Sequence, residues 1–160
     1  VDVLEALGVI VHRSPHSLAT ESAPGTRRLK GNLSVDMKPM SDQALTLGVL
    51  AAFADGPVTV TNVGHIRKHE SDRIAALGQN LARMGVRVDE RDDSFTVHPA
   101  TPRGAVIEPH DDHRNAMSFA LAGTRVPGVR ILDPGCVSKT FPSYFHVLQK
   151  VGVGVSFVWK

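Results

Sequence analysis

The sequence predicts a mixed α/β fold made of a helix–strand–strand–helix–strand unit that occurs twice. Helical apolar spacing alternates along the chain with short strand patterns, an order that favours an α/β architecture. The pattern around residues 42–60 returns around residues 114–132, at an offset of 72 (114 − 42 = 72). The helix after residue 42 is apolar on nearly every side, and its counterpart is built of small and apolar residues. We therefore expect buried helices, and a repeat unit that needs neighbours to cover its apolar faces.

The first unit spans approximately residues 1–66. Gly8 follows a short helical pattern and is placed to end that helix. Residues 13–30 are rich in Ser, Pro, Thr and Gly, which predicts a loop or irregular hairpin. Ser41 or Asp42 is placed to cap the buried helix. The expected elements are a helix ending at residue 8, strands at 9–12 and 33–37, a helix at 42–53 and a strand at 58–62.

The second unit spans approximately residues 67–134, and a closing helix and strand follow at residues 135–160. Ser71 and Asp72 precede a run of apolar residues at helical spacing, and Gly85 ends it. The expected elements are helices at 71–84 and 113–122, strands at 86–88, 94–98, 105–107 and 129–133, and finally a helix at 143–150 and a strand at 153–158.

Composition describes one soluble globular domain and excludes several classes of function. The 160 residues carry a net charge of +2 and only 5% aromatic residues, too little for a nucleic-acid partner. No apolar stretch reaches membrane-spanning length. A single cysteine, Cys136, fits a reducing compartment, so we expect a cytoplasmic protein. The chain opens inside a helical pattern and holds two repeat units, and both features predict a single partial domain.

Charged residues are dense where the strand at residues 58–62 gives way to a helix. Residues 65–73 hold three cations, two carboxylates and two histidines. Two further strand-to-helix switches carry Arg114 and Lys139, and Asp42 occupies the position equivalent to Arg114. Helix starts favour anions, and cations with carboxylates at one end of an array predict a site for a multiply anionic small substrate.

Each of these features also has a structural explanation. The charged stretch could be a solvated loop, and Asp42 could be only a helix cap. Asp112 could cap the second buried helix, with His113 facing the core. Histidines 65, 69 and 113 with Glu70 allow a metal site, but the spacing matches no metal motif, so we expect none. Cys136 lacks an evident base that would make it a nucleophile.

Four motifs resemble the C-terminal part of the 5-enolpyruvylshikimate-3-phosphate synthase family. They occur in the family's order and together cover approximately residues 3–150. They are Pro39-Met40-Ser41-Asp42, Lys68-His69-Glu70-Ser71-Asp72-Arg73, Asp112-His113-Arg114-x-Ala116-Met117 and Asp133-Pro134-x-Cys136-x-x-Lys139-Thr140-Phe141-Pro142.

The resemblance implies an enolpyruvate-transferase fold, an inside-out α/β barrel with buried helices and outer sheets. This chain would supply the last two units of one domain, and the family's N-terminal domain would be its missing partner. The implied reaction transfers the carboxyvinyl group of phosphoenolpyruvate to the 5-hydroxyl of shikimate 3-phosphate and releases phosphate, in the shikimate pathway to chorismate and aromatic amino acids. It implies no cofactor.

The resemblance also implies roles for individual residues. Asp42 would bind the shikimate hydroxyls and take the 5-hydroxyl proton. Glu70 would transfer a proton at the methylene carbon of phosphoenolpyruvate. Arg73, Arg114 and Lys139 would clamp phosphoenolpyruvate, with Lys139 also counted among the catalytic groups.

Two histidines depart from the family's commonest pattern. His65 and His69 stand where many members have asparagine and lysine, on the side that binds the phosphorylated shikimate. A histidine there can still donate a hydrogen bond, but its charge depends on pH. Two alternatives stay open: an enolpyruvyl transferase acting on UDP-N-acetylglucosamine, and a non-catalytic fragment that binds anions.

Overall fold

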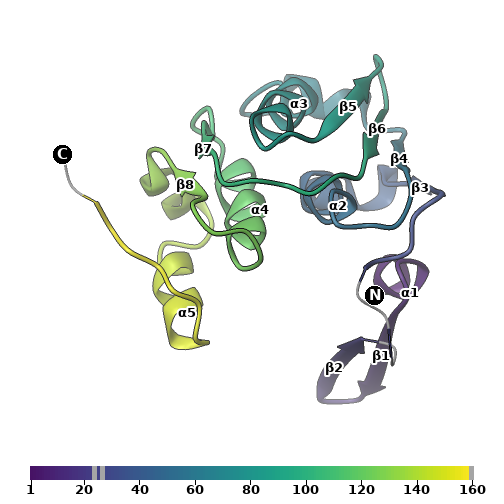
Figure 1. The fold of residues 1–160 in the computed structure, drawn as a ribbon, viewed down its shortest axis with the longest axis horizontal. Helices are drawn as coiled ribbons and strands as arrows, with labels where there is room; N and C mark the ends of the chain where they lie inside the picture. The colour runs from purple at the N-terminus through teal and green to yellow at the C-terminus, as the bar shows by residue number, and fades with distance from the viewer. Residues whose placement is uncertain (23–24, 26–27, 159–160) are drawn as a thin grey trace.

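The computed structural model describes residues 1–22, 25 and 28–158. Helices and short strands alternate along this part of the chain, and the predicted α/β class is confirmed. The α-helices are α1 (Asp2–Ala6), α2 (Ala44–Ala51), α3 (Arg73–Arg83), α4 (His113–Gly123) and α5 (Tyr144–Lys150). The 3-10 helices are η1 (Lys38–Gln43), η2 (Gly64–Lys68) and η3 (Pro134–Lys139). Figure 1 shows α4 between α2 and α5.

The strands in the described residues form three separate sheets. An antiparallel hairpin joins β1 (Val9–Ser14) and β2 (Ser17–Ser22). A four-stranded sheet has the order β3-β4-β6-β5 and consists of β3 (Leu33–Asp36), β4 (Val58–Thr61), β5 (Arg87–Glu90) and β6 (Phe95–His98). A short parallel pair joins β7 (Val106–Ile107) and β8 (Arg130–Ile131).

The main core lies between the four-stranded sheet and helices α2 and α3. Along β4, Val58 and Val60 are fully buried while the threonines between and after them are half-buried, which is the period of a sheet with one covered face. In α2, six of eight residues are buried. Each fully buried Val, Leu, Ile or Phe side chain contributes roughly 1.5–3 kcal/mol, so this interface holds the helix starts in place.

Helix α3 is amphipathic and is anchored at both ends. Asp72 caps it by accepting a hydrogen bond from the Ala75 N–H at 3.0 Å. Further along, the buried Asn80 side chain donates to the Glu108 carbonyl at 2.8 Å and accepts from the Glu108 N–H at 3.0 Å. This amide fixes the segment between β7 and α4 against α3, and that segment carries site residues.

Elements α1 to β4 and α3 to β8 follow the same order, apart from the 3-10 turns: a helix, three strands, a helix and a strand. Each has one strand more between its helices than the predicted unit. Gly8 and Gly85 end the equivalent helices α1 and α3 with φ of 83° and 81°, a conformation that favours glycine. Helices α2 and α4 lie side by side, and the hydroxyls of Thr46 and Ser118, 72 residues apart, are hydrogen-bonded at 3.1 Å. Equivalent positions of the two units therefore face each other.

The closing segment and the first hairpin both differ from what the sequence predicts. The strand predicted at residues 153–158 is wrong: this segment pairs with no strand in the described part of the chain. Val153 and Val155 do alternate with exposed residues, but a strand also needs a partner edge, and the Val155 carbonyl instead accepts from the Gln149 amide at 2.9 Å. The loop or irregular hairpin expected at residues 13–30 is instead, as far as residue 22, one side of a regular hairpin in which β2 pairs with β1. Residues 23–24 and 26–27 lie outside the described residues, as do 159–160.

None of the helices in the described part of the chain has the length and apolar composition needed to cross a bilayer.

Candidate active site

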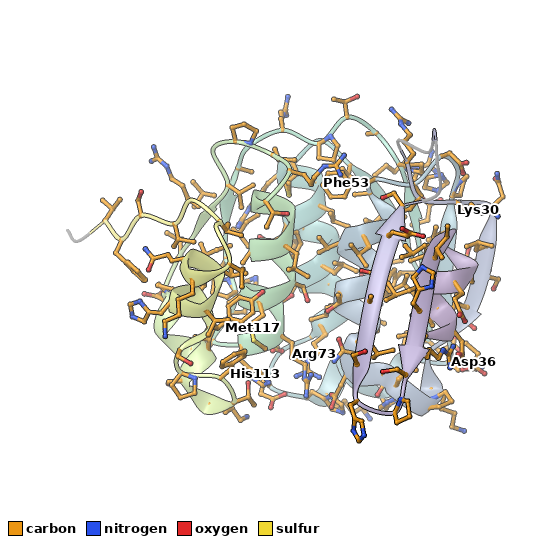
Figure 2. The ribbon with its side chains drawn as sticks, turned by 90° about the horizontal axis from the view of Figure 1, so that it is seen from below. Lys30, Asp36, Phe53, Arg73, His113 and Met117 are labelled. Carbon is orange, nitrogen blue, oxygen red and sulfur yellow. The ribbon has the colours of Figure 1, made fainter. Side chains whose placement is uncertain are left out.

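The first turns of α3 and α4 lie at the same end of the molecule. Figure 2 shows Arg73 and His113, which begin these helices, at one end, and Phe53, which follows α2, at the other. The three buried helix starts thus point the same way, as the repeat predicts. Their free N–H groups and positive dipole ends favour negative charge at this end.

Arg73 is the centre of the site. Its side chain is 2% exposed, and all five of its N–H donors have protein acceptors. Nε donates to Asp112 at 2.8 Å, and Nη2 donates to Glu70 at 2.8 Å and to Asp112 at 3.4 Å. Nη1 donates to Asp42 at 3.3 Å and to His69 Nδ1 at 2.9 Å. A guanidinium with five satisfied donors is rigid, so it orders the groups around it.

Asp112 is the buried counterion of Arg73. Its side chain is fully buried; it accepts from the Arg114 N–H at 2.9 Å, which caps α4, and from the Ser71 hydroxyl at 3.0 Å. Burial by itself would raise the pKa of Asp112, but the hydrogen bonds from Arg73 and the Arg114 N–H outweigh it, so the pKa lies below its usual value. The predicted cap is confirmed. Asp112 also forms an ion pair with Arg73, which the sequence did not predict.

Asp42 and Arg114, at equivalent positions of the two units, form an ion pair. Arg114 Nη2 donates to Asp42 Oδ2 at 2.8 Å, and Nη1 donates to the Asp42 carbonyl at 3.3 Å. The expectation that Ser41 or Asp42 caps the buried helix is wrong, because α2 begins after the 3-10 turn η1, with Gln43 at the cap position and no side-chain cap. The Asp42 carboxylate instead binds the guanidinium groups of Arg73 and Arg114.

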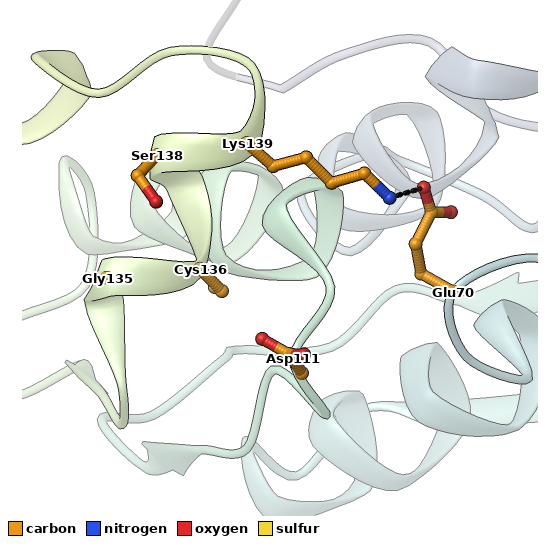
Figure 3. A pocket seen from close by; sticks show the side chains of 6 residues that line it. All are labelled: Glu70, Asp111, Gly135, Cys136, Ser138 and Lys139. Carbon is orange, nitrogen blue, oxygen red and sulfur yellow. Dashed lines mark hydrogen bonds and ion pairs between the residues drawn. The ribbon is translucent and has the colours of Figure 1, made fainter.

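Glu70 links the switch from β4 to α3 with the switch from β8 to α5. Its Oε1 accepts from Lys139 Nζ at 2.5 Å, and its Oε2 accepts from Arg73 (Figure 3). The hydrogen bond from Lys139 and one from the backbone lower the pKa of Glu70 from an ordinary 4.5 to about 2. Glu70 is therefore ionised at neutral pH while Lys139 remains in contact with it.

Two open cavities adjoin at this end, with volumes of about 460 and 510 Å³. Glu70 and Lys139 line both cavities, so their ion pair separates them. Figure 3 shows the first cavity, which is lined by Glu70, Asp111, Gly135, Cys136, Ser138 and Lys139. The second is lined by Asp42, His69, Glu70, Arg73, His113, Arg114, Lys139 and Thr140.

The structure brings together six of the seven residues selected from the sequence in the second cavity. His65 is the exception: its Nε2 is 2.9 Å from the Ser41 hydroxyl, and its ring meets that of His69 edge to face at 5.6 Å. The selection gave no substrate role to Asp112, which binds Arg73, or to His113 and Thr140, which line the cavity. A signal was available for each, because they adjoin Arg114 or Lys139 in the same two motifs.

His113 is buried at the floor of the second cavity. It is 2% exposed, and neither ring nitrogen has a hydrogen-bond partner within the described residues. Its Nδ1 lies 4.0 Å from Asp112 Oδ1, too far for a hydrogen bond. Burial lowers the pKa of His113, so the ring is neutral at pH 7. The expected burial is found, but in a polar cavity rather than an apolar core.

The sequence raised two other chemistries, a cysteine nucleophile and a metal site. Burial and the nearby carboxylate of Asp111 raise the pKa of the Cys136 thiol, which disfavours the reactive thiolate. Within the described residues, no three His, Cys, Asp or Glu side chains come together as a metal-binding group. The arrangement consists instead of three cations, Arg73, Arg114 and Lys139, joined to three carboxylates, Asp42, Glu70 and Asp112.

Comparison with known proteins decides the family. Residues 1–148 match the sequence profile of EPSP synthase (3-phosphoshikimate 1-carboxyvinyltransferase). The chain belongs to the EPSP synthase family. It is 49% identical over 97% of its length to 3-phosphoshikimate 1-carboxyvinyltransferase 2 of Halalkalibacterium halodurans, and 44% identical over 91% to the Nostoc punctiforme enzyme of that name. It spans only about a third of these EPSP synthase relatives, 34% and 33% of their lengths.

Solved structures agree with this family. EPSP synthase from Acinetobacter baumannii superposes with a TM-score of 0.81 and 27% identity, over 97% of this chain and 39% of that one. An enolpyruvyl transferase from Streptomyces tendae superposes with a TM-score of 0.75 at 22% identity, over 96% of this chain and 34% of that one, and so shares the fold. The enolpyruvate-transferase fold expected from the four motifs is confirmed.

Proposed function

We propose that this chain forms one side of the active site of a 3-phosphoshikimate 1-carboxyvinyltransferase. The observation that carries the proposal is the network of three cations and three carboxylates at converging helix starts in a member of the EPSP synthase family. The substrates would be phosphoenolpyruvate and shikimate 3-phosphate. Preorganised cations at such a site offset the charge of both anions and of the intermediate between them.

The reaction would form a bond between the 5-oxygen of shikimate 3-phosphate and C2 of phosphoenolpyruvate, and break the bond from C2 to the phosphate oxygen. The methylene carbon gains a proton during addition and loses one during elimination, while the 5-hydroxyl proton is removed. In this proposal Asp42 removes the hydroxyl proton, and Glu70 transfers the proton at the methylene carbon. Both carboxylates line the 510 Å³ cavity.

The hydrogen bonds divide the three cations into two kinds. Arg114 and Lys139 each keep N–H donors that have no partner within the described residues, so these donors are free for a phosphate or carboxylate group. Arg73 has no spare donor and reaches an anion only by exchanging one of its present acceptors. We therefore propose Arg114 and Lys139 as the primary clamp, with Arg73 joining by exchanging its longer Nη1 contact with Asp42, which leaves its contact with His69 in place.

Lys139 would couple anion binding to proton transfer. A carboxyl group with a pKa of about 2 is a poor proton donor near neutral pH. When Lys139 turns from Glu70 to the phosphate group, Glu70 loses the main cause of its low pKa and becomes easier to protonate. Substrate binding would thus prepare the acid that the addition step needs.

The proposal includes a partner and a location. The chain would act with the family's N-terminal domain, and its own units would be residues 1–66 and 67–134 with a closing segment at 135–160. The other domain would shield the site from water, because ion pairs open to solvent weaken to roughly 1 kcal/mol at contact distance. We place the protein in the cytoplasm, since its single cysteine fits a reducing compartment.

The test is phosphate release from purified protein supplied with both substrates. We expect no measurable turnover from the 160-residue chain alone, and turnover once the complementary N-terminal segment is added. The reconstituted protein with Asp42→Asn serves as the inactive reference. Turnover by the chain alone would contradict the need for a second domain. Anion binding without turnover after reconstitution would favour the non-catalytic alternative.

A further inference from the structure

The second cavity contains a histidine whose tautomer is set by its neighbour. His69 lines this cavity, and its Nδ1 lies 2.9 Å from Nη1 of Arg73. A guanidinium group has N–H donors only and stays protonated at all relevant pH values. Two N–H groups cannot bond to each other, so the facing Nδ1 must offer a lone pair. In a neutral imidazole the single proton then resides on Nε2.

We propose that Arg73 fixes His69 as its Nε2–H tautomer, so that His69 offers one directional hydrogen-bond donor to an oxygen of the phosphorylated substrate. The inference deepens the proposed function and rests on it for the identity of the ligand.

Arg73 acts as a fixed donor because it cannot turn away. Asp112 holds its Nε edge at 2.8 Å, Glu70 holds Nη2 at 2.8 Å, and the side chain is 2% exposed. The second N–H of Nη1 is directed at Asp42 at 3.3 Å, which leaves the first for His69. Rotating the guanidinium to release His69 would break contacts with three carboxylates.

A proton on Nδ1 of His69 would place an N–H against the Arg73 N–H and remove their hydrogen bond. The charged groups that face this contact are Asp42 from η1 and Glu70 beside it, and both already bind the same guanidinium. His65 faces the ring from η2. The contact with Arg73 therefore selects the tautomer that carries its proton on Nε2.

The ring of His69 is also held in orientation. The His65 ring meets it edge to face, with centroids 5.6 Å apart and planes inclined by 67°, and His65 is itself 2.9 Å from the Ser41 hydroxyl. Nε2 of His69 lies on the side of the ring away from Arg73 and has no protein partner within the described residues. A fixed donor with a free N–H at a cavity is suited to a phosphate or hydroxyl oxygen.

The tautomer is measured directly by NMR on the reconstituted protein with 15N-labelled histidine at pH 7, with His69→Gln used to assign the signal. Long-range correlations to the ring carbons distinguish a neutral Nε2–H ring from a neutral Nδ1–H ring and from an imidazolium. We expect the Nε2–H pattern for His69. An Nδ1–H or imidazolium pattern would overturn the proposal. The readout needs neither ligand nor turnover, so an inactive protein with this pattern would count against the proposed function alone.

A matched pair of variants tests the donor. The amide nitrogen of glutamine reaches the position of Nε2, and that of asparagine reaches the position of Nδ1. Calorimetric titration with shikimate 3-phosphate should show binding by His69→Asn weaker than binding by His69→Gln by about tenfold, the scale of one lost hydrogen bond to a charged group. Equal weakening in both variants, or in neither, would overturn the donor role. His69 is exposed, so both variants are expected to fold.

Discussion

The switch from β4 to α3 and the switch from β8 to α5 share a backbone path. In each, a residue with positive φ, Asn62 at 60° or Asp133 at 40°, leads from the strand into a 3-10 helix and then into an α-helix. Asn and Asp tolerate this conformation better than other residues with a side chain beyond Cβ. The repeat therefore supplies the same local geometry at both places.

The chemistry at the two switches differs. The α3 start has the capping Asp72 followed by the buried Arg73, whereas the α5 start has Ser143 without a side-chain cap, followed by Tyr144. The buried helix starts show the same contrast, since Asp42 and Arg114 occupy equivalent positions with opposite charge. Two copies with identical side chains would bring like charges together. The ion network exists because the sequence differs where the backbone repeats.

The largest expected effect comes from removing the buried carboxylate that only the second unit possesses. Asp112→Ala leaves the Arg73 guanidinium buried without its main counterion and also removes the cap of α4. We expect a loss of about 3–5 kcal/mol in the free energy of unfolding, measured by urea denaturation. Asp93→Ala, which removes an exposed carboxylate in a turn, is the control and should change stability by no more than about 0.5 kcal/mol. A similar small change for Asp112→Ala would show that Arg73 is satisfied without it.

The next effect concerns the charge that Arg114 contributes opposite Asp42. In the reconstituted enzyme, Arg114→Lys keeps the charge but loses the planar fork. We therefore expect kcat/KM for phosphoenolpyruvate to fall by a factor that corresponds to about 2–3 kcal/mol of transition-state stabilisation. Arg87→Lys is a matched control, because Arg87 also forms a two-pronged pair, with Asp89, but on the exposed strand β5. An unchanged kcat/KM in Arg114→Lys would argue against a clamp.

The contact between equivalent hydroxyls gives a smaller effect. Thr46→Val leaves the buried Ser118 hydroxyl without this partner, and Ser118→Ala removes the Ser118 hydroxyl itself. Each substitution should cost about 1 kcal/mol of stability. The double variant should cost clearly less than the sum, since no buried hydroxyl is then left unpaired. Additive losses in a thermal or urea unfolding cycle would show that α2 and α4 do not depend on this hydrogen bond.

The smallest effect is the pH dependence of the Glu70–Lys139 pair. The folded-state pKa of Glu70 is about 2 against an ordinary 4.5, so its contribution to stability is present above pH 4.5 and is lost as the pH falls toward 2. Because Lys139 is 56% exposed, we expect only about 0.2–1 kcal/mol. The measurement is the difference in unfolding free energy between the parent and Lys139→Met across this range. A difference that grows as the pH falls would have the wrong sign for this pair.

Local patterns were enough to predict most of the elements and the repeat. Helical spacing, capping residues and glycine stops act over a few residues, so α3, α4 and the hairpin of β5 and β6 could be placed from the sequence. The offset of 72 residues also predicted that Asp42 and Arg114 would lie at one end. The strand predicted at residues 153–158 failed because pairing depends on a partner edge that no local pattern encodes.

The sequence by itself determined which charged residues stand at the helix starts, and the four motifs determined the family. Only the tertiary structure decided which of them pair. Asp112 lies 39 residues from Arg73 in the chain, and Glu70 lies 69 from Lys139. Folding brings them within hydrogen-bond distance and excludes water around Arg73. Distance and burial set the strength of a charged contact, and neither can be read from residue order.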